Sequence, residues 1–381
     1  MPDIMASNPS LSPAEAPWRP TAEPEPTPLT HGQLVRQRFL RNKLAVIALI
    51  VIGLLYAIAI PAEFTAPYGT SDRFMGAINL PPQPVRVMDE EGQLSWPFVY
   101  GIKQTLDPKT FKRVFTPNLE SKHALQFFPQ VATYELFGLR ADRKLFGFGS
   151  GAGHLLGTDN QGRDMLSRTI HGGRVSLLVG LIGVALSMII GTLVGLVSGL
   201  AGGWVDNTIQ RAIEVILTFP NIPLWMAFSA AIPDTWTPVQ VFFVMSIIIS
   251  FIGWTPLARV VRGITLSVKA EEYVTASRIS GASGWWIIRH HLLPGNVSYI
   301  VVSLTLAIPS MILGETALSF LGLGIRPPMV SWGSLLQTSQ DINVIANQPW
   351  VVFSAAVPVV LAVLAFNFIG DGIRDAIDHT A

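Results

Sequence analysis

Few residues in this sequence have types and spacings that could carry out a reaction. Nearest to a phosphate-binding loop is the stretch 157–164, GTDNQGRD, but it lacks the lysine that reaches the phosphates, and no Gly-Lys pair occurs in the chain. A turn leading into a helix, capped by Asp159 or Asn160, is the better interpretation. We therefore expect the chain to hydrolyse no ATP itself.

Catalytic and metal-binding patterns are also missing from the sequence. It contains neither Gly-x-Ser-x-Gly nor His-Glu-x-x-His, and the adjacent His290 and His291 face different sides of a helix, which makes them poor joint ligands. The absence of cysteine excludes disulfides, thiolate metal sites and cysteine nucleophiles. We expect no enzyme and no metal site, and a structural or partner-facing role for the two histidines.

Three ionisable residues, Arg211, Glu214 and Glu315, interrupt apolar segments. An ionisable group at membrane depth is costly and is a functional candidate by default. Arg211 and Glu214 are three residues apart and could form an ion pair instead. Glu315 has no evident local partner, so it could line a translocation path or bond to a neighbouring helix. Glu214 and Glu315 are therefore the candidate path residues.

The composition indicates a membrane protein. Of 381 residues, 50% are hydrophobic and only 13% are charged, whereas a globular domain carries about 25% charged residues. The net charge of +1 provides no field that would favour nucleic acid. The lipid bilayer is the expected surrounding.

Six apolar runs are long enough to cross a bilayer at 1.5 Å per helical residue. The sequence thus predicts an all-α membrane protein with six transmembrane helices. In the second run Gly191, Gly195 and Gly199 recur every fourth residue, a pattern that lets another helix pack closely. Prolines 220, 256, 309 and 358 predict kinks around a central cavity. The six runs are Leu44–Ile60, Val175–Ala201, Ile209–Ile232, Val239–Val261, Ser298–Leu321 and Trp350–Ile369.

Short basic flanks predict the orientation. The N-terminal flank and residues 259–289 each carry a Lys/Arg cluster, whereas the loops 233–238 and 322–349 carry only Arg326. The positive-inside rule then places both termini in the cytoplasm. The loop from residue 61 lies outside, and its alternating stretches 85–88 and 94–98 predict a small, partly β extracytoplasmic insertion. The predicted divisions are a disordered cytoplasmic tail at 1–30, a flank with the first helix at 31–60, the insertion at 61–153 and a core of five helices at 154–378.

The most informative cytoplasmic stretch is 271–294. Gly281 divides it into two short amphipathic helices, and the small residues Ala276 and Ser277 keep the surface shallow enough for a partner to seat. The alternative is a helix pair that lies on the lipid headgroups, anchored by Trp285 and Trp286.

The spacing of this stretch resembles the EAA loop of binding-protein-dependent ABC importer permeases. That pattern reads E-A-A, three residues, G, nine residues, I, one residue, L-P. Ala276, Ser277, Gly281, Leu293 and Pro294 fall in its register. The sequence departs from the pattern at three positions. Thr275 stands where the pattern has glutamate, Ser277 where it has the second alanine, and His291 where it has isoleucine.

The resemblance covers about residues 30–378 and narrows to the C-type subunit of oligopeptide and dipeptide permeases, which have a MetI-like transmembrane domain. It rests also on the stretches 154–159 (HLLGTD), 162–168 (GRDMLSR), 315–324 (ETALSFLGLG) and 331–333 (SWG). The family implies a multi-pass protein of the bacterial inner membrane that pairs with a homologous second permease. It also implies a solute-binding protein and two ATPase subunits, which hold the Mg-ATP. The loop 263–295 would dock on an ATPase, with these residues in the contact: Glu272, Tyr273, Ala276, Ser277, Gly281, Ala282, Ser283, Leu293 and Pro294.

The resemblance implies an importer for dipeptides, oligopeptides or peptide-like compounds. Some relatives handle oligosaccharides or opine-type compounds, so the resemblance does not identify the solute. The main alternative is an ion-coupled secondary transporter, which predicts inverted repeats and more buried acids. An intramembrane hydrolase would need a nucleophile paired with a base, and no histidine lies in the six runs. A pure scaffold is the remaining alternative.

Overall fold

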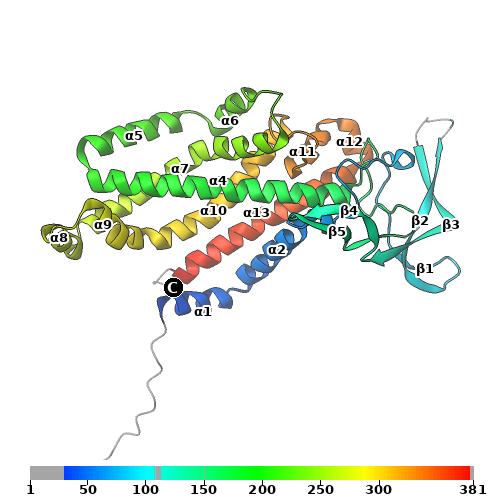
Figure 1. Ribbon diagram of the computed structural model, residues 1–381, viewed down its shortest axis with the longest axis horizontal. Helices are drawn as coiled ribbons and strands as arrows, with labels where there is room; N and C mark the ends of the chain where they lie inside the picture. The colour runs from blue at the N-terminus through cyan, green and yellow to red at the C-terminus, as the bar shows by residue number, and fades with distance from the viewer. Residues whose placement is uncertain (1–29, 107, 109–112, 150, 378–381) are drawn as a thin grey trace, which may run out of the picture.

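The computed structural model describes residues 30–377 except 107, 109–112 and 150. The predicted disordered tail lies, apart from Thr30, outside the described residues. Long helices form an elongated bundle with β-strands at one end (Figure 1). The helices are α1 (His31–Arg41), α2 (Lys43–Ala59), α3 (Ala62–Thr65), α4 (Met165–Ala201), α5 (Gly203–Thr218), α6 (Asn221–Ala230), α7 (Pro238–Lys269), α8 (Glu272–Ile279), α9 (Gly284–Ile287), α10 (Leu293–Phe320), α11 (Trp332–Leu336), α12 (Ile342–Asn347) and α13 (Pro349–Ile377), with a π-helical turn at Ile288–Leu292 and short 3-10 turns at Met75–Ala77 and Gln337–Gln340.

Four helical stretches of the described chain are long and apolar enough to cross a membrane: α4, α7, α13 and Gly284–Phe320, which includes α10. Two further helix pairs pass the same test but are sharply bent. The bend between α1 and α2 is 92°, and the bend between α5 and α6 is 85°. The described residues therefore contain four spans, or up to six if each bent pair is one span.

The predicted third span, Ile209–Ile232, is not one continuous helix. It divides at Pro220, which lacks a backbone donor and forces Phe219 into an extended conformation with φ −84° and ψ 133°. The three other prolines lie inside helices that continue past them, in α7, α10 and α13. Proline alone does not break a helix when neighbouring helices support it.

The helix α4 begins at Met165, well before the predicted start of the second span. Its N-cap is Asp164, whose carboxylate accepts hydrogen bonds from the Ser167 amide at 2.8 Å and the Ser167 hydroxyl at 2.7 Å. The prediction of Asp159 or Asn160 as the cap was therefore wrong. Asp159 instead binds the guanidinium groups of Arg163 and Arg168, and both of those bonds are 2.8 Å long.

The predicted hairpin over residues 85–98 is formed. Strand β1 (Arg86–Met88) pairs antiparallel with β2 (Leu94–Leu106) around Gly92, whose φ of +80° suits a residue without Cβ. A longer ribbon joins β2 to β3 (Arg113–Phe127), and β6 (Phe146–Phe148) completes the order β1-β2-β3-β6. Strands β4 (Gln130–Leu136) and β5 (Leu139–Arg143) form a separate hairpin.

The segment before β1 is hydrogen-bonded to the segment that leads into α4. The Asn79 amide donates to the Asp159 carbonyl at 3.0 Å, and the Thr158 amide donates to the Leu80 carbonyl at 2.9 Å. A Cβ on Gly157 would lie 2.5 Å from the Leu80 carbonyl oxygen, so only glycine fits this approach. The β-strands are therefore tied to the start of α4 through the backbone.

The three glycines spaced every fourth residue in α4 lie directly against α7. A Cβ on Gly191 or Gly195 would lie 2.7 Å from a backbone carbonyl oxygen of α7, and one on Gly199 would lie 2.7 Å from the Thr265 side chain. Lipid chains are as apolar as side chains, so close van der Waals packing has to hold membrane helices together. The structure thus places this stripe in the α4–α7 contact.

The main core is shared by α4, α7, α10 and α13. Leu177 of α4, Met245 and Ile249 of α7, and Ile312 and Leu318 of α10 are almost completely buried there. The strands lie at one end of this bundle and the α8–α9 pair at the other, while α1 and the end of α13 lie on the α8–α9 half (Figure 1).

Candidate functional site

Gly281 separates α8 from α9, as predicted. Its φ is +86°, and a Cβ there would meet no atom within 4 Å, so the backbone conformation rather than space requires glycine. The amides of Ser280 and Ala282 donate to carbonyls at the end of α8, Ala276 and Ser277. These bonds satisfy the last carbonyls of α8 and fix the turn.

The helix α9 starts at the next residues of the turn. The Ser283 hydroxyl accepts a hydrogen bond from the Trp286 amide at 3.3 Å and so caps this helix. Hydrogen-bonded ends on both sides make the α8–α9 turn a defined element and not a loose loop.

The outer surface of the α8–α9 pair combines a shallow hollow with exposed apolar side chains. The side chain of Ile279 is 82% exposed, and Tyr273 and Trp285 are also exposed. Apolar groups clustered on a surface usually mark a contact with a protein or a membrane. The hollow of about 570 Å³ is lined by Ala276, Ser277, Ser280, Gly281, Ala282, Ser283 and Trp286.

The inner surface of the same pair is anchored in the bundle. Val274 of α8 and Ile287 of α9 are buried in one cluster with Leu196 of α4 and Val261 of α7. The chain also runs from α7 into α8 with only a short turn, and from α9 through the π-helical turn into α10. A displacement of α8 and α9 would therefore be passed to α7 and α10.

The two histidines pack against the side chains of this pair. The Nε2 atom of His291 lies 2.9 Å from the Ser277 hydroxyl, and its ring contacts those of Tyr273 and Trp286. His290 stacks on Trp286 at a centroid distance of 4.4 Å. No group of three metal-ligating side chains occurs in the described part of the chain. His291, which stands where the family pattern has isoleucine, thus links α8 to the next turn.

An ion pair that was not predicted from the sequence fixes α4, α5 and α7 at this end of the bundle. The Asp206 carboxylate, which is nearly buried, receives two hydrogen bonds from the Arg262 guanidinium, at 2.5 and 2.6 Å. The Ser198 hydroxyl donates to the same carboxylate at 2.5 Å, and Lys269 donates to the Leu200 carbonyl at 2.6 Å. One sequence pattern could have predicted this ion pair. An acid follows a Gly-Gly turn, and basic residues lie in the next long helix.

The structure separates the two candidate path residues. The Glu214 carboxylate pairs with Arg211 at 2.8 Å on an exposed face of α5, so the predicted ion pair is formed. Glu315 is fully buried and accepts hydrogen bonds from the hydroxyls of Ser176 at 2.8 Å and Ser319 at 2.6 Å. Glu315 therefore has one partner on α4 and a local one four residues on in α10, so the expectation that it has no local partner was wrong.

A central cavity of about 460 Å³ opens among α5, α6, α7 and α10. None of its lining side chains is a carboxylate, an ammonium or a guanidinium, and the polar groups come mainly from Asn221, Tyr299, Ser303 and Ser310. Neither Glu214 nor Glu315 is among the lining residues. One face of α10 forms a wall of this cavity, because its lining residues follow helical spacing. These are residues 299, 303, 306, 307, 310 and 311.

A buried polar cluster supports the junction between the bundle and the strands. His154 Nδ1 lies 2.9 Å from the Asp164 carboxylate, and the His154 amide donates to the Gln83 side chain at 2.6 Å. The indole of Trp350 on α13 donates to the Thr158 carbonyl at 3.0 Å. The HLLGTD and GRD stretches thus hold the strands, α4 and α13 together.

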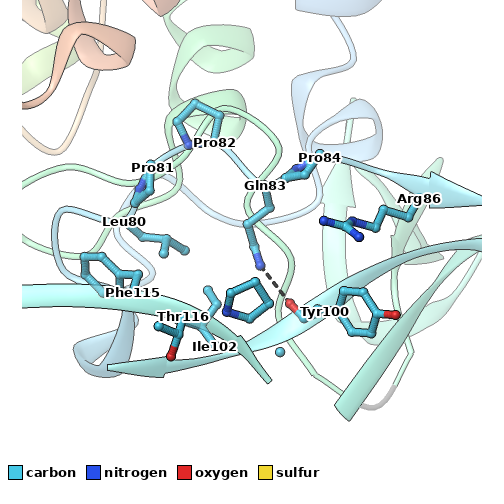
Figure 2. Close-up of a pocket in the computed structure, with 12 residues that line it drawn as sticks. Leu80, Pro81, Pro82, Gln83, Pro84, Arg86, Tyr100, Ile102, Phe115 and Thr116 are labelled. Atoms are coloured by element: carbon cyan, nitrogen blue, oxygen red, sulfur yellow. Dashed lines mark hydrogen bonds between the residues drawn. The ribbon is translucent and has the colours of Figure 1, made fainter. Parts of the chain in front are cut away.

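A narrow crevice of about 130 Å³ lies between the segment 80–86 and the strands β2 and β3. Figure 2 shows its wall of prolines and the Gln83 side chain, which donates to the Tyr100 carbonyl at 3.0 Å. The Arg86 guanidinium lies 5.4 Å from the centre of the Tyr100 ring. The crevice is mainly apolar and has one cation at its edge.

Two family models match the chain. One describes a binding-protein-dependent transport system inner membrane component and covers residues 191–380, and the other describes the N-terminal TM domain of oligopeptide transport permease C and covers residues 30–82. The chain is 39% identical over 229 residues to a peptide permease protein of Brucella suis, covering 60% of this chain and 74% of the relative.

Two further relatives carry more specific names. The oligopeptide transport system permease protein of Haemophilus influenzae is 42% identical over 225 residues, which is 59% of this chain and 70% of the relative. The glutathione transport system permease protein of Pectobacterium atrosepticum is 41% identical over 230 residues, which is 60% of this chain and 74% of the relative. Together with the apolar helices, these matches show that the chain belongs to the family of binding-protein-dependent transport system inner membrane components, as a multi-pass ABC importer permease of the oligopeptide and dipeptide type.

Proposed function

We propose that the chain forms half of the translocation path of an ATP-driven importer for a peptide-type solute. A homologous second permease would form the other half, and two ATPase subunits would bind and hydrolyse Mg-ATP. The observation that carries the proposal is the α8–α9 pair, which exposes apolar side chains outward and is anchored in the bundle on its inner side.

The α8–α9 pair is proposed as the ATPase-docking element. Its hollow offers small side chains, Ala276, Ser277 and Ala282, where a helix or loop of a partner can approach closely. The exposed Ile279 and Tyr273 border it and would supply apolar contact area. Because the pair is continuous with α7 and α10, closure of the ATPases would tilt the helices that line the central cavity. Leu293 and Pro294 would then lie at the start of α10, which moves with the pair. They would support the ATPase contact without touching the ATPase themselves.

The orientation follows from this assignment. If α8 and α9 face the cytoplasm, then α1 and the end of α13, on the same half of the bundle, place both termini there too (Figure 1). The strands at the opposite end would then be extracytoplasmic. They would help to dock the solute-binding protein, and the crevice beside Arg86 and Tyr100 is a surface that such a partner could enter.

The central cavity supports a path that binds its solute weakly. Its lining offers hydrogen-bonding groups but no carboxylate, ammonium or guanidinium, so it would release solute readily and leave selectivity to the binding protein. The relatives are named for peptides, oligopeptides, glutathione and dipeptides, which supports a peptide-type solute. An oligosaccharide or an opine-like compound is the alternative.

The test is to purify the tagged chain from native membranes in mild detergent and to identify its stoichiometric partners by mass spectrometry. We expect a second permease and ATPase subunits, and recovery of the chain alone under ATP-trapping conditions would refute the proposal. Ile279→Asp should release the ATPases but keep the second permease. Ile342→Asp is the matched control, since Ile342 is 79% exposed on α12. Equal retention of the ATPases by both variants would exclude the α8–α9 docking site.

A further inference from the structure

A second cavity, of about 510 Å³, adjoins the central one and has a very different lining. It lies between α5 and α7, and every side chain that lines it is polar or charged. These residues are Asn207, Gln210, Arg211 and Glu214 of α5, with Arg259 and Arg262 of α7. Of these residues, only Arg211 and Glu214 stood out in the sequence.

Neighbouring residues of the same two helices line both cavities. On α5 the polar lining ends at Glu214 and the central cavity begins at Leu217, one turn further along. On α7 Arg259 lines the polar cavity, while Val260 and Pro256 line the central one. The polar cavity therefore lies beside the central cavity, displaced toward the α8–α9 end of the bundle.

The charges around this opening do not cancel. Arg211 is paired with Glu214 at 2.8 Å, and Arg262 is paired with Asp206 behind the cavity wall. For Arg259 the described part of the chain provides no carboxylate and no hydrogen-bond acceptor. The guanidinium of Arg259, an exposed residue, is therefore left to bind an external group.

We infer that the Arg259 mouth is an oxyanion site that receives the carboxylate of the solute as it leaves the central cavity. A guanidinium binds a carboxylate through two parallel hydrogen bonds, a geometry that an ammonium does not offer. The uncharged central cavity gives such a solute no electrostatic hold, so Arg259 would attract it toward the exit. The solutes are thus carboxylate-bearing, as free peptides are. The inference rests on the proposed function for its direction of transport.

A lipid phosphate is the other source of the same chemistry, because a headgroup is also an oxyanion. Both sources require the same positive potential at Arg259, and they differ in what occupies the site. The experiment therefore measures the potential first and the occupant second.

The chain has no cysteine, so a single introduced thiol reports its own surroundings. Asn207→Cys places a thiol in the lining, and Thr208→Cys places one on the next residue of α5, outside the lining. In the purified complex, each thiol is reacted with a negatively charged sulfonate and a positively charged ammonium methanethiosulfonate, and the products are quantified on this chain by mass spectrometry.

We expect the Asn207→Cys thiol to prefer the sulfonate reagent. Adding Arg259→Gln should lower the sulfonate-to-ammonium rate ratio by roughly fivefold at low salt, the size expected for one unit charge several ångströms away in a largely aqueous mouth. The ratio for Thr208→Cys should change much less. An unchanged ratio at Asn207→Cys would overturn the inference.

The occupant is then tested by protection of the Asn207→Cys thiol. Dialanine should slow the sulfonate reaction, whereas its C-terminal amide should not, and Arg259→Gln should abolish the difference. The same measurement in phosphatidylcholine vesicles with and without phosphatidylglycerol tests the lipid. Protection by phosphatidylglycerol alone would assign the site to a headgroup and refute the solute, and protection by neither would refute an oxyanion site. Since labelling needs no ATPase, these outcomes are separate from the partner analysis that tests the proposed function.

Discussion

The close packing of α4 on α7 makes a single methyl group at residue 195 destabilising. In Gly195→Ala the new Cβ would lie 2.7 Å from the Ala258 carbonyl oxygen and 2.8 Å from the Val261 Cβ, whereas an ordinary contact begins at 3.4 Å. The oxygen belongs to the backbone, so it cannot turn away as a flexible side chain would. The two helices must instead separate by about 0.7 Å at this point.

The expected size follows from two opposing effects. Overpacking of this kind costs about 1–3 kcal/mol, because a gap of about 0.5–1 Å removes a quarter to half of each dispersion contact along the separated surface. Replacing glycine by alanine inside a helix returns about 1 kcal/mol. The net loss of unfolding free energy is therefore about 1 kcal/mol, which corresponds to a fall in Tm of about 1 °C for a chain of this length.

The matched control is Gly263→Ala in α7. Gly263 also lies inside a helix, but its Cβ would meet no atom within 4 Å. Only the helix-propensity gain remains, so Tm should rise. Thermal unfolding of the purified chain in one detergent measures both variants. If Gly195→Ala raised Tm as much as Gly263→Ala, the close α4–α7 contact would be refuted.

Two further predictions concern ion pairs. Asp206→Asn removes the charge that binds Arg262 and should lower Tm, because a hydrogen bond to a charged group contributes about 1.5–3 kcal/mol. Asp234→Asn breaks an exposed pair with Arg326 and should change Tm little; equal effects would show that the first pair is no tighter than the second. The other prediction concerns the effect of pH on the ion pair of Glu63. Partial burial alone would raise the pKa of its carboxyl, but the hydrogen bond and charge of Arg174 outweigh burial and hold the pKa below its ordinary value of 4.5. A lowered folded-state pKa stabilises the fold above the unfolded value and loses this effect as the pH falls through the folded value. Glu63→Gln should thus lower Tm near neutral pH and match the unchanged chain in acid, and a pH-independent difference in Tm would contradict the ion pair.

Local features of the fold could be read from the sequence because they depend on neighbouring residues. Apolar length located the long helices, the alternation around Gly92 predicted the β1–β2 hairpin, and Gly281 was identified as the residue between two short helices. Arg211 and Glu214, one helical turn apart, were correctly predicted as a pair. The family was recognised for the same reason, since its motifs are short and fixed in spacing.

Features that depend on distant segments could not be read in this way. Ser176 of α4 is 139 residues from its partner Glu315, and Arg262 of α7 is 56 residues from its partner Asp206, so the sequence around either acid does not indicate these two partners. The break in the helix at Pro220 also could not be predicted from the sequence. Prolines interrupt several of the apolar runs, and only the packing around each one decides whether its helix continues.

Sequence alone determined what can be decided by hydrophobicity, backbone conformation and short-range spacing: a membrane bundle, its β-hairpin and the helix pair around Gly281. Only the tertiary structure decided which polar groups meet, because a buried charge is stabilised by whatever partners the packing brings within hydrogen-bonding distance. The tertiary structure also placed the mouth at Arg259 beside an uncharged central cavity, although the lining residues lie on helices separated in the chain. Packing, and not spacing along the chain, thus determines where this permease presents Arg259, whose guanidinium has no acid partner among the described residues.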